Sequence, residues 1–312
     1  MSIKNILKAA LPNKFYNIIR TRPRPAIISS HLYNKIKNIN KTAWLQDPDN
    51  RGDVLGILRK QAHILDKGLQ SNKRESGHGL SLAMELQKNL EKINSEQAST
   101  NTAIWAQGIA TYHTQLQSGL LSNKDYTNFP FLSKNALSFD ELFSAMQERR
   151  SIRHFQNEKP QIELITKALR GSVWAPSSCN RQTIVLYLAS NIELSKKCAS
   201  YNKGATSLSG SYLFISVCFD TRSYHLPHES LTGFIDASLG FQNSLLLLHS
   251  LGLGACVLNW SHSDQHEEIS LRKALNIPDY CEIAFNVIVG IPAQGAPTPG
   301  KKSPKEFILE IQ

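Results

Sequence analysis

The chain has no hydrophobic run long enough to cross a membrane. A transmembrane helix needs about 20 consecutive apolar residues, and the longest apolar stretch here, SLLLLHSLGLGACVLNW, is interrupted by His249 and by glycines. A signal-peptide pattern is also missing, because Lys8 interrupts the short apolar run near the N-terminus and no cleavage site follows it. We therefore expect a cytoplasmic protein whose apolar residues form a buried core.

The sequence is also short of the motifs that mark metal and nucleotide sites. It contains no CxxC pair, no GxGxxG, no P-loop and no HExxH, and its ten histidines form no recognisable ligand set. Zinc ribbons and iron–sulfur clusters are therefore not supported, and we predict no bound metal. The odd number of well-separated cysteines is typical of small buried residues in a reducing compartment. They are Cys179, Cys198, Cys218, Cys256 and Cys281.

Acidic residues are absent from the first 46 positions. Residues 1–41 carry nine Lys and Arg, whereas from Phe139 onward 16 basic residues balance 16 acidic ones, so the net charge of +10 belongs to the N-terminal part. The segment 1–46 is either a weak contact with an anionic membrane, peripheral at its inner face, or a solvated helix that packs on the protein's own surface. We expect no nucleic-acid partner.

Hydrophobic spacing predicts an all-helical extension over residues 47–136. Apolar residues recur at helical spacing in DVLGILRKQAHILDKGLQ, in LSLAMELQKNLEKI and in AIWAQGIATYHTQLQ. The following stretch SNKDYTNFPFLSKNALS reads as a linker. The extension contains no cysteine and no motif with an assignable function.

Residues 137–312 have a different character. TIVLYLAS and SYLFISVCFD are rich in β-branched and aromatic residues and predict strands, and the nearly continuous apolar run CEIAFNVIVGIP predicts a central strand. Helical patterns stand between them, in IELITKALRG, FIDASLGFQNSLLLLHSLGLG and EEISLRKALNI. This alternation predicts a layered α+β domain.

Cations gather where one helix of this domain ends. SFDELFSAMQ predicts a helix with Ser138 as its N-cap, and ERRSIRHF follows at 148–155. Cations in a last turn suit the helix dipole, but that accounts for one or two of them and not for Arg149, Arg150 and Arg153 around Ser151. Their guanidinium groups are suited to charge-assisted bonds with phosphate oxygens. The pattern therefore indicates an anion site.

Four further segments follow in order: APSSCNRQ at 175–182, the helix DASLGFQNSLLLLHSLGLG, ACVLNW at 255–260, and PGKKSP near the C-terminus. Together the five segments resemble the nitroreductase family of FMN-dependent oxidoreductases, over about residues 137–312. The resemblance implies an α+β fold with a mostly antiparallel central sheet flanked by helices. It implies that the anion is the phosphate of FMN.

The resemblance also implies the site residues and the partners. Flavin N5 would carry hydride from NADH or NADPH to an electron-poor small-molecule acceptor, so no catalytic side chain is predicted. The 176–180 segment would reach a flavin held mainly by the partner subunit, which makes the chain a homodimer with shared active sites. The predicted cofactor-binding residues are Arg149, Arg150, Ser151, Arg153, Pro176, Ser177, Ser178, Asn180, Asn202, Val257, Leu258, Asn259, Trp260 and Lys302.

Two departures from the family pattern and two other functions remain open. RQTIVLY stands where the family has Q-P-W, which changes the rim of the pocket, and Lys302 stands where Arg is common. One alternative is a flavin-dependent tailoring enzyme or dehydrogenase in a biosynthetic pathway, such as that of a polysaccharide. Another is an adaptor, in which the helical extension binds a partner and the flavin domain is vestigial.

Overall fold

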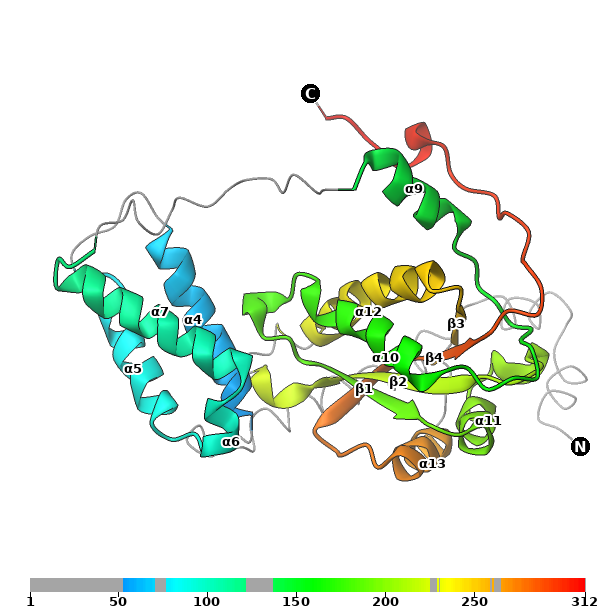
Figure 1. Cartoon of the computed structure of the whole chain (residues 1–312), viewed down its shortest axis with the longest axis horizontal. Coiled ribbons are helices and arrows are strands. Elements are labelled where there is room, and N and C mark those ends of the chain that lie inside the picture. Colours follow the sequence, from blue (N-terminus) through cyan, green and yellow to red (C-terminus); the bar gives the residue numbers. More distant parts are fainter. Residues whose placement is uncertain are drawn as a thin grey trace, which may run out of the picture.

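A computed structural model of the chain describes residues 53–70, 77–121, 137–224, 229, 231–258, 260 and 265–311. The basic segment 1–46, most of the expected linker, and Asn259 lie outside these residues. Figure 1 shows a group of helices on one side and a larger unit built on a β-sheet on the other. The two units come into contact at one end of the sheet.

The helical extension forms a small bundle of its own. Its helices are α4 (Val54–Leu69), α5 (Leu80–Leu90), the short α6 (Ser95–Ala98) and α7 (Asn101–Gln117). The predicted apolar stripes face one another, and the buried residues of the bundle core include Leu58, Leu65, Leu86 and Ile109. The three helices predicted over 53–117 are thereby confirmed.

The larger unit is built on a four-stranded antiparallel sheet of order β1-β2-β4-β3. Its strands are β1 (Ile184–Ala189), β2 (Leu213–Asp220), β3 (Gly254–Leu258) and β4 (Cys281–Gly290). The predicted strands β1, β2 and β4 are confirmed, and β4 is central as expected. The sequence pattern did not predict β3, the edge strand that carries most of ACVLNW.

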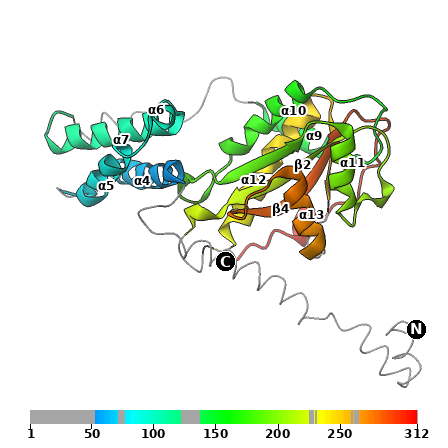
Figure 2. The same ribbon diagram turned by 90° about the horizontal axis from the view of Figure 1, so that it is seen from below.

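Helices cover both faces of this sheet. On one face lie α10 (Ile162–Leu169), the 3₁₀ turn η1 (Arg170–Trp174) and α12 (Thr232–Ser250), and on the other lie α11 (Ile192–Ser200) and α13 (Gln265–Leu275). Figure 2 shows this layering from below. Successive residues of β2 alternate between the two cores, since Phe214 belongs to one and Ile215 to the other. The predicted α+β architecture is confirmed.

The first helix of this unit, α9 (Phe139–Glu148), begins as predicted. Ser138 caps it and forms a capping box with Glu141, and hydrogen bonds from Ser138 lower the pKa of the Glu141 carboxyl. Its apolar stripe remains uncovered in the single chain, where Phe139 is 75% exposed and Met146 is 46% exposed. The pattern therefore predicted the helix, and the structure leaves its apolar face free for another surface.

Candidate functional site

Residues 149–155, here called the arginine segment, leave α9 in an extended conformation and run beside the edge strand β3. Arg149 terminates the helix with φ −56° and ψ 131°. Ser151 pairs with Ala255 in a parallel bridge, and the Ile152 N–H donates to the Ala255 carbonyl at 3.0 Å. The segment thus brings two of the predicted groups, 149–153 and the start of ACVLNW, side by side.

Two apolar side chains anchor this extended segment, while the residues between them are exposed. Ile152 and Phe155 are buried at 9% and 3% exposure, whereas Arg153 and His154 are exposed. The Phe155 N–H donates to Ser209 and the Gln156 N–H to Ile291, at 3.0 and 2.8 Å. These anchors hold the backbone against the sheet, so the guanidinium of Arg153 is presented on a fixed scaffold.

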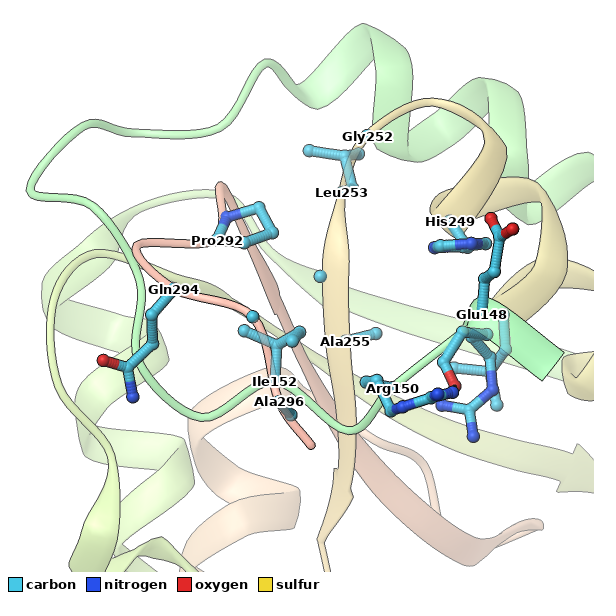
Figure 3. Close-up of a pocket in the computed structure, with 14 residues that line it drawn as sticks. Glu148, Arg150, Ile152, His249, Gly252, Leu253, Ala255, Pro292, Gln294 and Ala296 are labelled. Atoms are coloured by element: carbon cyan, nitrogen blue, oxygen red, sulfur yellow. The ribbon is translucent and has the colours of Figure 1, made fainter. Parts of the chain in front are cut away.

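Pockets lie on both sides of this segment. The larger one, of about 430 Å³, is bordered by Arg149, Arg150, His249 and the Gly252–Ala255 turn (Figure 3). The second, of about 210 Å³, is bordered by Ser151–His154. Both share the 294–296 stretch of the C-terminal segment. The segment and the two hollows together form a concavity at the β3 edge of the sheet.

The three arginines differ in how they are engaged. Within the described residues, neither Arg149 nor Arg153 makes a side-chain hydrogen bond or ion pair. Burial raises the pKa of the Cys256 thiol while these two arginines oppose the rise, which places both charges near β3. Arg150 instead donates to the Gln147 and Arg149 carbonyls and, at 2.8 Å, to the Thr298 hydroxyl. Arg149 and Arg153 are therefore the cations available to an external anion.

The end of β3 provides backbone as well as side chains. Past the Ser151 bridge its outer edge has no strand partner in the described part of the chain, and Val257 is 46% exposed. Leu258 and Trp260 are buried at 3% and 4% exposure in the core on the α11 side. The predicted contact of the Trp260 side chain with a flavin stays a prediction, and Asn259 lies outside the described residues.

Two other predicted residues lie apart from the arginine segment. Asn202 is buried, donates to the Cys198 carbonyl at 3.1 Å and accepts from Asn286 at 2.8 Å. Lys302 is exposed just before the short turn η6 (Pro304–Glu306), and makes no hydrogen bond or ion pair within the described residues. Their roles as cofactor contacts stay predictions.

The predicted loop at 176–182, here called the 176–182 loop, has a strained backbone. Cys179, Asn180 and Gln182 have φ values of 52°, 51° and 52°, in the left-handed region that side chains with a Cβ disfavour. The 3₁₀ turn η2 (Ser178–Asn180) lies within it. Such strain persists where the surrounding structure holds it, and is typical of functional loops.

Asp236, in the first turns of α12, accepts a hydrogen bond from the backbone of this loop. Both of its carboxylate oxygens lie 3.1 Å from the Ser178 N–H, and the Tyr224 hydroxyl donates to it at 3.1 Å. Burial raises the pKa of the Asp236 carboxyl, although these two donors oppose the rise. Sequence reasoning did not select Asp236, but its position as an acid within the apolar stretch FIDASLGF was a usable signal. No such signal marked the 294–296 stretch that borders both pockets.

The 176–182 loop and the arginine segment are not brought together within one chain. The loop leads into β1, at one edge of the sheet, and the arginine segment lies beyond β3, at the other edge. Four strand spacings of roughly 4.8 Å separate them, or about 19 Å across the sheet. Trp174 stands exposed just before the loop, at 85%.

Metal chemistry receives no support from the geometry. Across the described ranges, no group of three or more His, Cys, Asp or Glu side chains is placed to hold a metal ion.

Comparisons with known proteins agree with the motif order. A model of the "Nitroreductase family" matches residues 146–210 and 210–291. The protein named "Putative NADH dehydrogenase/NAD(P)H nitroreductase" of Methanothermobacter thermautotrophicus is 30% identical over 173 residues, which are 54% of this chain and 87% of that protein. The "FMN reductase [NAD(P)H]" of Bacillus subtilis is 23% identical over 169 residues, 49% of this chain and 67% of that protein.

A solved structure from Parabacteroides distasonis, also named "Putative NADH dehydrogenase/NAD(P)H nitroreductase", matches 55% of this chain and 99% of its own, with 25% identity and a TM-score of 0.49. The family model falls on the unit that carries the arginine segment, the 176–182 loop and β3. The chain belongs to the nitroreductase family.

Proposed function

We propose that this chain is an FMN-dependent oxidoreductase that uses NADH or NADPH. The observation that carries the proposal is the pair Arg149 and Arg153, two cations without an anionic partner on a rigid segment beside a concave site. A relative named FMN reductase [NAD(P)H] and one named NAD(P)H nitroreductase support the choice of cofactor and donor. When bound, FMN would supply the hydride carrier between the nucleotide and an electron-poor acceptor.

The chain's own residues fit that cofactor. Arg149 and Arg153 would hold the phosphate through charge-assisted bonds, and Ser151 between them adds a hydroxyl donor. The open outer edge of β3 near Val257 would offer backbone N–H groups to negative charge that develops on the ring of a bound flavin. Arg150, tied to Thr298, would shape the border of the site instead of pairing with the phosphate.

Removing the two free cations tests this assignment. In the double variant Arg149→Ala with Arg153→Ala we expect FMN affinity to fall on the order of a hundredfold or more, since each charged bond is worth about 1.5–3 kcal/mol. Lys159→Ala, at an exposed cation outside the pockets, is the matched control. Unchanged FMN binding in the double variant would exclude these arginines as the phosphate site.

We further propose that the active sites are shared between two copies in a homodimer. The 176–182 loop and the arginine segment lie at opposite edges of one sheet, so one chain alone does not close the site. Exposed apolar residues on α9, on α12 and at the N-cap of α12 offer a surface for the second copy. They are Phe139, Leu142, Phe143, Met146, Leu231, Ile235 and Leu239.

The basic N-terminal segment is proposed as a weak contact with anionic membranes. Residues 1–41 carry nine cations and no acid, and each cation near an anionic surface contributes about 1 kcal/mol. None of the described helices is both long and apolar enough to cross a bilayer. We expect the full chain to sediment partly with anionic vesicles at low salt, and a chain starting at Asp47 not to. Equal behaviour of the two would dismiss this contact.

A further inference from the structure

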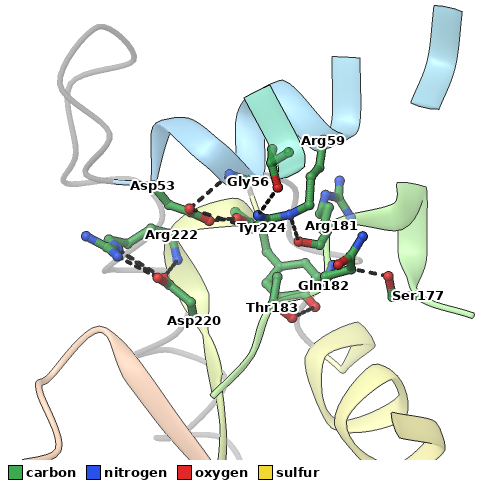
Figure 4. Close-up of polar contacts among 12 residues, drawn as sticks. Asp53, Gly56, Arg59, Ser177, Arg181, Gln182, Thr183, Asp220, Arg222 and Tyr224 are labelled. Atoms are coloured by element: carbon green, nitrogen blue, oxygen red, sulfur yellow. Dashed lines mark hydrogen bonds and ion pairs between the residues drawn. The ribbon is translucent and has the colours of Figure 1, made fainter. Parts of the chain in front are cut away.

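The helical extension contacts the 176–182 loop through the side chain of Arg59 on α4. The Nε–H of Arg59 donates to the backbone carbonyl of Arg181 at 2.6 Å, across 122 positions of sequence (Figure 4). The same guanidinium donates through Nη1 to the Thr102 hydroxyl of α7 at 3.2 Å. Burial lowers the pKa of Arg59, while Asp53 and Asp220 oppose the shift. The Arg59 side chain, 14% exposed, thus bonds to the loop carbonyl and to Thr102, and its Nη2 also pairs with the Asp53 carboxylate at 3.9 Å.

The α4 helix is itself docked tightly where it meets the loop. Asp53 caps α4 through the Gly56 N–H at 2.9 Å, and its second oxygen accepts from the Ser223 hydroxyl of the turn η4 (Thr221–Ser223). A Cβ at Gly56 would lie 2.4 Å from the Ser223 oxygen, so glycine permits this close approach. The start of α4 is therefore held at a fixed place beside the end of β2.

Arg181, whose carbonyl accepts from Arg59, is also held through its own side chain. The Arg181 side chain is 1% exposed, pairs with Glu229, donates to the Ser178 hydroxyl at 3.0 Å, and stacks 5.2 Å from the Tyr224 ring centre. Its carbonyl faces the extension and its guanidinium faces the sheet unit. Arg181 is consequently the point at which the two units share the loop.

The loop depends on such external contacts because its own backbone is unfavourable. Three of its residues have left-handed φ values, although the Gln182 N–H donates to the Ser177 hydroxyl at 3.1 Å across the loop. From the sheet unit, Asp236 of α12 accepts from the Ser178 N–H, and Glu229 and Tyr224 hold the Arg181 side chain. From the extension, Arg59 of α4 donates to the Arg181 carbonyl.

We infer that Arg59 is a positioning residue for the flavin-contacting loop, and that the helical extension serves to hold this loop in its strained, binding-competent form. Arg59 touches neither cofactor nor substrate; it acts through the Arg181 carbonyl. The part of this inference that concerns flavin rests on the proposed function, in which Ser177, Ser178 and Asn180 contact FMN.

The test compares full-length variants at Arg59 with a matched control. Arg59→Ala removes the hydrogen bond to the Arg181 carbonyl, and Arg59→Lys keeps the charge and one donor. Lys67→Ala removes an exposed cation from the far end of the same helix. Amide hydrogen exchange of residues 177–183 is measured without FMN, and FMN affinity and the visible circular dichroism of the bound flavin are measured with it.

We expect Arg59→Ala to raise exchange of the 180–182 amides and to weaken FMN binding, each about tenfold, as for loss of one charge-assisted bond. The flavin dichroism should change in Arg59→Ala and return towards the wild type in Arg59→Lys. Lys67→Ala should match the wild type in all three measurements. If exchange of the loop in Arg59→Ala equals that in Lys67→Ala, the inference is overturned.

The outcomes separate this inference from the proposed function. A wild-type chain that binds no FMN refutes the function, while the exchange measurement still decides whether Arg59 holds the loop. A wild type that binds FMN, with unchanged affinity, dichroism and exchange in Arg59→Ala, refutes only the inference. If Arg59→Ala does not fold, Thr102→Val releases Nη1 of Arg59 and should shift loop exchange in the same direction by less; no shift there overturns it.

Discussion

Substitution of Gly254 tests how closely the arginine segment is packed on β3. Gly254 pairs with Gly290 across the sheet, and the side chain of Ile152 covers it. A Cβ built on Gly254 would lie 2.8 Å from Cβ, 2.9 Å from Cγ1 and 3.0 Å from Cγ2 of Ile152. These atoms are close to the backbone, so rotation of the side chain cannot relieve the contact and the segment itself must move.

The size of the effect follows from the missing space. Non-bonded carbon atoms have an optimal separation of about 3.5–4.0 Å, so Gly254→Ala should displace Ile152 by about 1 Å. Overpacking of this kind costs about 1–3 kcal/mol of unfolding free energy. Arg149 and Arg153 flank Ile152 and move with it, and weakening one of their phosphate bonds should reduce FMN affinity by about tenfold or more.

The assay combines two measurements on Gly254→Ala and on a matched glycine variant. FMN affinity is measured by quenching of flavin fluorescence, and the free energy of unfolding by denaturant titration. Gly108 lies exposed within α7 and a Cβ there meets no atom within 4 Å. Gly108→Ala should leave FMN affinity unchanged and stabilise the chain by up to about 1 kcal/mol, because alanine is the better helix former.

Two results would refute this reasoning. Gly254→Ala with the stability and FMN affinity of the wild type would mean that the segment does not pack on β3 as described. If Gly254→Ala lost stability but kept full FMN affinity, the packing of Ile152 would not determine the geometry of the phosphate site.

Two further predictions concern the loop support and the dimer. Asp236 has a raised pKa in the folded chain, so the folded state binds a proton there more tightly than the unfolded state does. The free energy of unfolding should therefore fall as pH rises from the ordinary aspartate pKa to the raised one, and then level off. Denaturant titrations across this range should show that loss in the wild type and not in Asp236→Asn, and parallel curves would contradict it. Ile235 and Leu239 are 57% and 47% exposed on α12, and changing both to Lys should yield monomers in light scattering, because an apolar interface does not accommodate unpaired charges. Ile104→Lys, at an exposed position of α7, should remain dimeric, and a dimeric double variant would place the interface elsewhere.

Local sequence predicted the secondary structure well where pattern and caps agreed. Ser138 and the 139–146 stripe predicted the start and the extent of α9, because each signal lies within one turn or one segment. The continuous apolar run of β4 likewise predicted its central place. β3 escaped prediction because five residues directly after a long apolar helix carry no period of their own.

The arrangement of the site depended on contacts between distant segments. Pro176 and Ser177 predicted a loop, but the left-handed backbone of Cys179 and Gln182 has no local cause, since neither residue favours it. The bond from Arg59 to Arg181 spans 122 positions, and only the docking of α4 brings its two ends together. The sequence therefore predicted which segments would contribute to a site, and tertiary packing determined which of them lie together and which side chains remain available to a ligand.

The most direct test of the central claim is a spectroscopic titration of the purified full chain. The account predicts that added FMN is retained through gel filtration, with one flavin per chain, and that NADH or NADPH bleaches its visible absorbance under anaerobic conditions. A chain that elutes colourless after saturation with FMN, or a bound flavin that keeps its absorbance with both nucleotides, would contradict the account.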